Sequence, residues 1–139
     1  MNRFILASHG KMSKGVLNTA EMILGKLPNC YAVSTERGET QSISCTIKNL
    51  VKDWPKEDTI YILTDVLGGS VNNQALTLLA DFPDINVISG MNLPLIFNLL
   101  SMESNVSDKD LADILEESRK GIINCSAALK STSSKEDDL

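Results

Sequence analysis

The sequence predicts a single α/β domain in which helices cover both faces of a mainly parallel sheet. Short apolar runs alternate four times with segments of helical periodicity, which is the pattern of consecutive βα units. The apolar runs are continuous rather than alternating with polar residues, as expected of strands that are buried on both faces. The length of 139 residues is typical of one domain with a layered core.

The first βα unit contains the only histidine of the chain. Residues 3–7 form an apolar run that predicts a buried strand, and a turn over residues 8–12 contains His9. A helix is expected from Ser13 to Gly25, because apolar residues recur at helical spacing and glycine is favoured where a helix ends. His9 is therefore expected two residues beyond the first strand.

The second unit repeats this order. Residues 30–34 predict a short strand, and a polar loop follows it. Thr40 is a candidate N-cap for a helix whose apolar stripe extends from Ile43 to Trp54. This stripe is interpreted as core packing.

The third unit combines the clearest strand with an unusual loop. Residues 59–64 are β-branched and apolar, and they lead directly into Asp65. Gly68, Gly69 and Ser70 follow, and a helix is expected over residues 71–80. The glycines let backbone N–H groups point into one cavity, while Ser70 can cap the helix and offer a hydroxyl. Such an arrangement can hold a phosphoryl group.

The rest of the chain completes the alternation. Residues 85–89 predict a fourth strand, and a helix is expected over residues 93–102. Ser107 is followed three residues later by Asp110 in the pattern of a capping box, which predicts a longer helix. Residues 131–139 are rich in serine and charge, so we set the folded domain at residues 1–129 and a polar, flexible tail at residues 130–139.

The expected topology brings His9 and Asp65 together. In the flavodoxin-like strand order, the first and third strands are neighbours at the point where the order reverses, and ligands of such sheets bind there. Taken alone, Asp65 is more simply a cap for the following helix, and Gly68 and Gly69 fit a tight turn as well as a phosphate site. The presence of His9 favours the functional interpretation, because a neutral imidazole is a nucleophile near pH 7.

Composition excludes several other classes. A net charge of −5 argues against binding to nucleic acid or to anionic lipid. Cys30, Cys45 and Cys125 are far apart and do not cluster with histidine, so neither a disulfide framework nor a zinc site is indicated. No carboxylate cluster suggests magnesium, and no metal or cofactor is expected. The first apolar run is too short for a signal peptide or a membrane span, which places the protein in the cytoplasm.

Four motifs together resemble a known family. They are residues 8–10 (Ser-His-Gly), 19–25 (Thr-Ala-Glu-Met-Ile-Leu-Gly), 63–70 (Leu-Thr-Asp-Val-Leu-Gly-Gly-Ser) and 89–94 (Ser-Gly-Met-Asn-Leu-Pro). In this order and at these distances they resemble the IIA component of the mannose-family (mannose/fructose/sorbose) sugar phosphotransferase system. The resemblance extends over about residues 2–129.

The resemblance implies a cytoplasmic homodimer with a doubly wound sheet. An antiparallel strand from near the C-terminus of the partner subunit is commonly added to that sheet. Residues after Ser126 are the candidate for this strand, although residues 127–129 also extend a helical pattern.

The resemblance also implies a phosphocarrier. His9 would be phosphorylated by the carrier protein HPr, with Asp65 as its partner, and would pass the phosphoryl group to a IIB component. A sugar entering through the membrane components IIC and IID would finally receive it. By analogy with the family, Nε2 of His9 attacks phosphorus while Asp65 accepts a hydrogen bond from Nδ1–H. The amides of Gly68 and Gly69 and the hydroxyl of Ser70 would hold the phosphoryl oxygens.

Some positions depart from the family pattern. Val71 stands where the family often has proline, and Val66-Leu67 stands where some members have Thr-Trp. These changes leave His9, Asp65 and the glycines intact, so they concern the finer contacts of the loop and the choice of partner.

Two alternative functions are open. One is a phosphocarrier subunit that feeds dihydroxyacetone kinase with the same fold and histidine. The other is a non-catalytic, flavodoxin-like module that binds a nucleotide or flavin. Residues 9–15 do not match a phosphate-binding P-loop, and no dinucleotide-binding glycine motif follows the first strand, which argues against the second alternative. The transported sugar is not indicated, since its specificity would reside in the membrane components.

Overall fold

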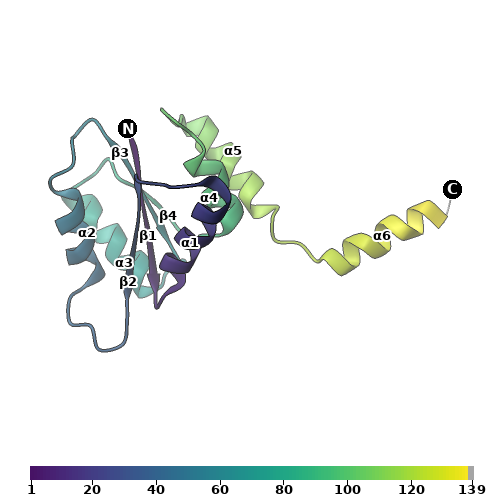
Figure 1. Cartoon of the computed structure of the whole chain (residues 1–139), viewed down its shortest axis with the longest axis horizontal. Helices are drawn as coiled ribbons and strands as arrows, with labels where there is room; N and C mark the ends of the chain where they lie inside the picture. Colours follow the sequence, from purple (N-terminus) through teal and green to yellow (C-terminus); the bar gives the residue numbers. More distant parts are fainter. Residues whose placement is uncertain (138–139) are drawn as a thin grey trace.

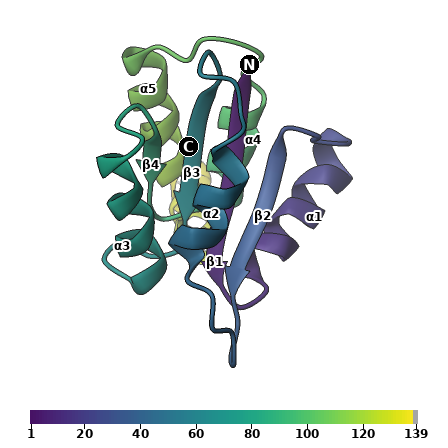
Figure 2. The same cartoon turned by 90° about the vertical axis from the view of Figure 1, so that its left-hand side faces the viewer.

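The structure is a computed structural model that describes the backbone of residues 1–137 and the side chains of residues 1–132. Four parallel strands form one sheet in the order β2-β1-β3-β4 (Figures 1 and 2). The strands are β1 (Asn2–His9), β2 (Cys30–Thr35), β3 (Thr59–Thr64) and β4 (Asn86–Ile88). The predicted α/β class and flavodoxin-like strand order are confirmed.

Helices cover both faces of the sheet. On one face lie α2 (Ile43–Val51) and α3 (Ser70–Thr77), and a short 3₁₀ turn, η1 (Leu78–Ala80), continues α3. On the other face lie α1 (Met12–Leu24), α4 (Leu93–Leu100) and α5 (Asp108–Arg119). The last helix, α6 (Cys125–Asp137), extends away from this body (Figure 1).

Strand β1 explains why both faces need helices. Successive side chains of a strand point to opposite faces. Phe4 and Leu6 accordingly lie in the core beneath α1 and α4, while Ile5 and Ala7 lie in the core beneath α2 and α3. All four side chains are fully buried, which confirms the interpretation of the continuous apolar run.

The helix ends agree with the sequence in two places and differ in a third. Gly25 ends α1 with a φ of 85°, and Ser107 with Asp110 forms the expected capping box at α5. The predicted cap of α2 is wrong, because Ser42 rather than Thr40 is the N-cap and accepts a hydrogen bond from the Cys45 N–H at 3.3 Å. Both residues can cap a helix, and the path of the preceding loop decides between them.

The C-terminal segment forms a helix rather than a strand. Residues 125–137 belong to α6, so the helical interpretation of residues 127–129 is the observed one. In the described part of the chain, the sheet contains only parallel pairs. Helix α6 passes through the expected boundary between residues 129 and 130, and residues 138–139 of the expected tail lie outside the described residues. No helix in residues 1–137 has the length and apolar character required to cross a membrane.

Candidate functional site

His9 and Asp65 meet at the carboxyl ends of the two central strands. His9 is the last residue of β1, where it pairs with Thr35 of β2, and Asp65 directly follows β3. The backbone N–H of His9 donates to Asp65 Oδ2 at 2.8 Å. The prediction that His9 lies two residues beyond its strand is therefore wrong, because pairing with β2 continues through His9.

The His9 ring lies between two polar side chains. Its Nδ1 is 2.6 Å from Asp65 Oδ2, and its Nε2 is 2.8 Å from Ser70 Oγ. The His9 side chain is 51 % exposed, whereas that of Asp65 is only 10 % exposed. A shielded carboxylate thus holds one side of a ring whose surface is accessible to other molecules.

The state of Asp65 determines how the ring carries its proton. Partial burial by itself raises the pKa of Asp65, but hydrogen bonds from the His9 backbone, the His9 ring and the Val66 N–H outweigh it and lower that pKa below its usual value. An ionised carboxylate can only accept hydrogen bonds. In the neutral ring Nδ1 is therefore the donor, and Nε2 is the acceptor that Ser70 contacts.

Two glycines shape the loop between Asp65 and α3. Gly68 has a φ of 79°, a conformation that costs other residues about 1 kcal/mol or more. A Cβ on Gly69 would lie 2.8 Å from Val66 Cγ1 and 3.3 Å from Val66 O. The sharp path of the loop therefore favours glycine at position 68 for its backbone conformation and at position 69 for the lack of space beside Val66.

The amide groups of these glycines have partners within the loop. Gly68 N–H donates to Asn72 Oδ1 at 3.2 Å, and Gly69 N–H donates to Val66 O at 3.1 Å. The expected capping role of Ser70 is wrong, since Gly69 is the N-cap of α3 and Ser70 instead directs its hydroxyl to His9. Ser70 and Val71 begin the helix, where backbone N–H groups lack intrahelical acceptors and favour anions.

Sequence analysis missed two buried polar residues that hold the site. Ser8 is fully buried, and its Oγ accepts the Ser13 N–H at 2.8 Å, which anchors the start of α1 just after His9. Asn72 is 3 % exposed and bonds to both Thr64 and Gly68. The sequence feature that could have indicated Asn72 is its position in the first turn of the predicted helix, close to the apolar residues that face the core.

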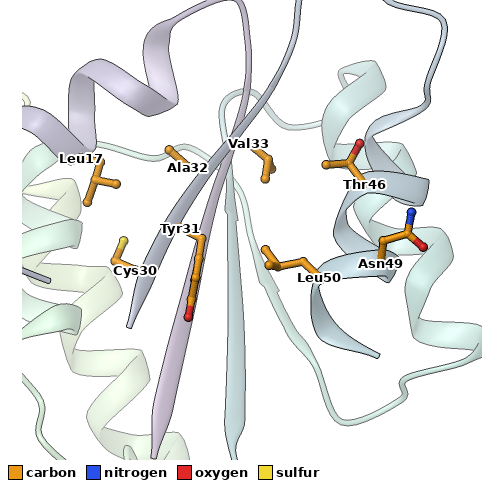
Figure 3. A pocket seen from close by; sticks show the side chains of 8 residues that line it. All are labelled: Leu17, Cys30, Tyr31, Ala32, Val33, Thr46, Asn49 and Leu50. Atoms are coloured by element: carbon orange, nitrogen blue, oxygen red, sulfur yellow. The ribbon is translucent and has the colours of Figure 1, made fainter. Parts of the chain in front are cut away.

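The surroundings of His9 combine charge with exposed apolar side chains. An open hollow of about 530 Å³ is lined by His9, Gly10, Lys11, Thr35, Glu36 and Arg37. Val66 and Leu67, in the loop that follows Asp65, are 56 % and 77 % exposed. A second hollow, of about 640 Å³, lies along the open edge of β2 between α1 and α2 and contains none of the predicted site residues (Figure 3).

The site offers few ligands for a metal ion. Among the side chains that the structure describes, those of residues 1–132, no three of histidine, cysteine, aspartate or glutamate come together in a metal-binding arrangement. The polar groups that converge are those of His9, Asp65 and Ser70. Their order matches a nucleophile or base, the carboxylate that orients it, and a hydroxyl donor.

Comparison with known proteins relates this geometry to a family. The family model described as "PTS system fructose IIA component" matches residues 3–116. The chain belongs to the mannose family of phosphotransferase-system IIA components. Proteins of this family are phosphotransfer proteins, and His9, Asp65 and Ser70 all lie within the matched region of this IIA protein.

Curated relatives and solved structures agree with this assignment. The IIA protein is 29 % identical over 113 residues to the fructose-specific EIIA component of Bacillus subtilis, covering 81 % of this chain and 77 % of that one. It is 32 % identical over 113 residues to the sorbose-specific EIIA component of Klebsiella pneumoniae, covering 81 % and 82 %. The EIIA structure from Streptococcus agalactiae superposes with a TM-score of 0.79 at 28 % identity, covering 91 % and 99 %.

Proposed function

We propose that this IIA protein accepts a phosphoryl group from phosphorylated HPr on Nε2 of His9 and passes it to a IIB component. The observation that carries the proposal is the His9 ring, which a shielded carboxylate holds at Nδ1 while about half of the side chain, 51 %, is exposed. This arrangement suits a group that must accept phosphate from one protein and give it to another. The sugar would enter through the membrane components IIC and IID, and the exchange would take place in the cytoplasm.

Each residue has a defined task in the transfer. A bond forms between Nε2 and phosphorus as the bond between phosphorus and the donor side chain breaks. The ring gains positive charge, and Asp65 offsets it through the Nδ1–H contact. Ser70 Oγ, 2.8 Å from Nε2, turns its hydroxyl from the ring nitrogen to a phosphoryl oxygen. The N–H groups of Ser70 and Val71 at the start of α3 favour the same negative charge.

The glycines serve this site mainly by their conformation. The N–H groups of Gly68 and Gly69 bond within the loop in the unphosphorylated protein. Their contact with phosphoryl oxygens, expected from the sequence, would require these bonds to open. The sharp turn that the glycines permit places Ser70 in contact with the His9 ring, which also contacts Asp65.

The test is phosphorylation with phosphoenolpyruvate, enzyme I and HPr, followed by mass mapping of the labelled residue. We expect one acid-labile phosphate on His9 and none on His9→Ala. Ser70→Ala should still be labelled on His9 but about ten- to a hundredfold more slowly, because a hydrogen bond to a charged group is lost. An unlabelled wild-type protein, or an acid-labile phosphate on His9→Ala, would contradict the proposal.

The same assay separates two other functions. The contacts Asp65–His9–Ser70 also have the order of a hydrolytic triad, in which serine is the nucleophile. In that case the phosphate would be an acid-stable ester on Ser70, and Ser70→Ala would lose all labelling instead of being slowed. The acceptor distinguishes a sugar system from a subunit that serves dihydroxyacetone kinase, because only a IIB component should discharge phosphorylated His9 in the proposed function.

We also propose that the protein is a homodimer. Ile122 and Ile123, between α5 and α6, are 79 % and 62 % exposed, and Leu129 on α6 is 70 % exposed. This segment leaves the body of the domain (Figure 1). Burying such side chains against a second copy is favourable by about 25 cal/mol per Å² of apolar surface.

A further inference from the structure

We propose that Asn72 is a positioning residue for His9, an inference that rests on the proposed function. Asn72 lies in the first turn of α3, and its side chain is 3 % exposed. The hydrogen bonds of this side chain go to Thr64 and Gly68 rather than to His9. Any effect on transfer must therefore act through the loop that supplies Asp65 and Ser70.

Asn72 connects both parts of that loop. Its Nδ2 donates to Thr64 Oγ1 at 2.9 Å, and its Oδ1 accepts the Gly68 N–H at 3.2 Å. Thr64 is the last residue of β3 and immediately precedes Asp65, while Gly68 lies two residues before Ser70. One buried amide thus spans the segment from which both His9 contacts come.

Thr64 provides a rigid reference for this connection. It is fully buried, it is paired with Ala7 in the sheet, and its carbonyl accepts the Met91 N–H at 3.0 Å. Gly68, in contrast, is exposed and has a φ of 79°. Asn72 therefore links the fixed end of β3 to an exposed turn of the loop, where the Gly68 carbonyl also accepts a hydrogen bond from Asn73 Nδ2 at 3.2 Å.

The conformation of this loop affects phosphoryl transfer through the two short hydrogen bonds of the His9 ring. Asp65, at the start of the loop, lies 2.6 Å from Nδ1, and Ser70, at its end, lies 2.8 Å from Nε2. Both contacts are kept only if the loop holds one conformation. A displacement of about 1 Å can reduce the rate of a positioned reaction about a hundredfold.

The experiment compares Asn72→Ala with Asn2→Ala. Asn2 is another buried asparagine, 5 % exposed, but it lies at the opposite end of β1, where Nδ2 donates to Met102 O at 3.4 Å. Asn2→Ala should lower the melting temperature without changing the site. Thr64→Val removes only the Thr64 end of the connection and keeps the side-chain shape, so it is the second variant if Asn72→Ala does not fold.

Two readouts are expected to change in Asn72→Ala and Thr64→Val. The kcat of phosphoryl transfer from HPr should fall about tenfold or more, while the KM for HPr stays within about twofold of wild type because the exposed surface is retained. The ¹⁵N spectrum of the single histidine should show a smaller Nδ1–H tautomer fraction. Asn2→Ala should leave both readouts at the wild-type value.

The outcomes distinguish this inference from the proposed function. If wild-type protein is not phosphorylated, the proposed function fails, and the histidine spectrum still decides whether Asn72 orders the ring. If wild type is phosphorylated and both variants retain its kcat and its tautomer fraction, Asn72 has no positioning role. The inference is also wrong if Asn2→Ala changes both readouts as much as Asn72→Ala does.

Discussion

At the scale of single residues, Asp65 organises the site through both of its oxygen atoms. Oδ2 accepts from the His9 backbone at 2.8 Å and faces Nδ1 of the His9 ring at 2.6 Å. Oδ1 accepts the Val66 N–H at 2.8 Å. Because backbone groups hold the carboxylate, its orientation is set before any partner binds, and the ring takes its orientation from it.

We expect Asp65→Asn to slow phosphoryl transfer to His9 by about a hundredfold or more. The amide preserves the shape of the side chain but removes the negative charge that offsets the phosphorylated ring. It can also present N–H to Nδ1 and select the wrong tautomer. Rapid-quench measurement of phosphate on His9 checks this expectation.

The matched control for this variant is Asp84→Asn. Asp84 is exposed and lies outside the site, so its substitution should leave the transfer rate unchanged. Equal rates for Asp65→Asn and wild type would show that the carboxylate is not required, despite its contact with the ring.

At the scale of elements, the site depends on strands whose opposite ends are also fixed. Asp58, just before β3, contacts Arg3 of β1 at 2.6 Å and the ammonium group of Met1 at 2.9 Å. The Arg3 guanidinium lies 4.7 Å above the Trp54 ring. This cluster aligns β1 with β3 at the end opposite to His9 and Asp65.

Asp58→Asn should destabilise the protein at neutral pH but not in acid. Hydrogen bonds from Arg3 and the terminal ammonium group lower the pKa of Asp58 below 3.8. A carboxyl group whose pKa is lower in the folded state stabilises above its unfolded pKa, and the effect disappears as pH falls through the folded pKa. The melting temperature of the variant should therefore lie below that of wild type at pH 7, and the difference should close below pH 3.8.

Asp53→Asn is the control for this titration. Asp53 is exposed on the same connection between α2 and β3, and its substitution should give a melting curve close to that of wild type at every pH. A difference for Asp58→Asn that persists in acid would mean that the cluster stabilises by packing rather than by charge.

At the scale of the whole molecule, the described chain consists of a compact body and an extended C-terminal segment. The body has a buried core on each face of the sheet. The segment with Ile122 and Ile123 lies outside both cores, and the residues that follow it in α6, 125–132, are exposed. A second copy is the proposed partner for this surface.

Light scattering should give a mass of about twice 15.1 kDa for the wild-type chain. The double substitution Ile122→Asp with Ile123→Asp should shift the mass towards 15.1 kDa, because charge is costly in an apolar interface. Met22→Asp is the control, since Met22 is 80 % exposed on α1 and lies outside the segment. A wild-type mass of 15.1 kDa at high concentration would contradict the dimer.

Local sequence patterns were sufficient for most of the architecture. The continuous apolar runs predicted all four strands, because buried parallel strands need apolar side chains on both faces. The capping box at Ser107 was predicted because its two hydrogen bonds join residues only three apart. The predicted cap at Thr40 was wrong because several nearby residues can cap a helix, and the path of the loop, which local sequence does not specify, selects Ser42.

The succession of strands and helices followed from the sequence itself, whereas the meeting of His9 with Asp65 followed only once a flavodoxin-like strand order was assumed. Periodicity specifies the elements, and the observed order β2-β1-β3-β4 confirms the assumption that places the ends of β1 and β3 side by side. Only the tertiary structure decided that Ser70 faces His9 instead of capping α3, and that Asn72 connects Thr64 with Gly68. Such bonds depend on the conformation of a tight loop between buried elements, and residue types and spacing do not specify that conformation.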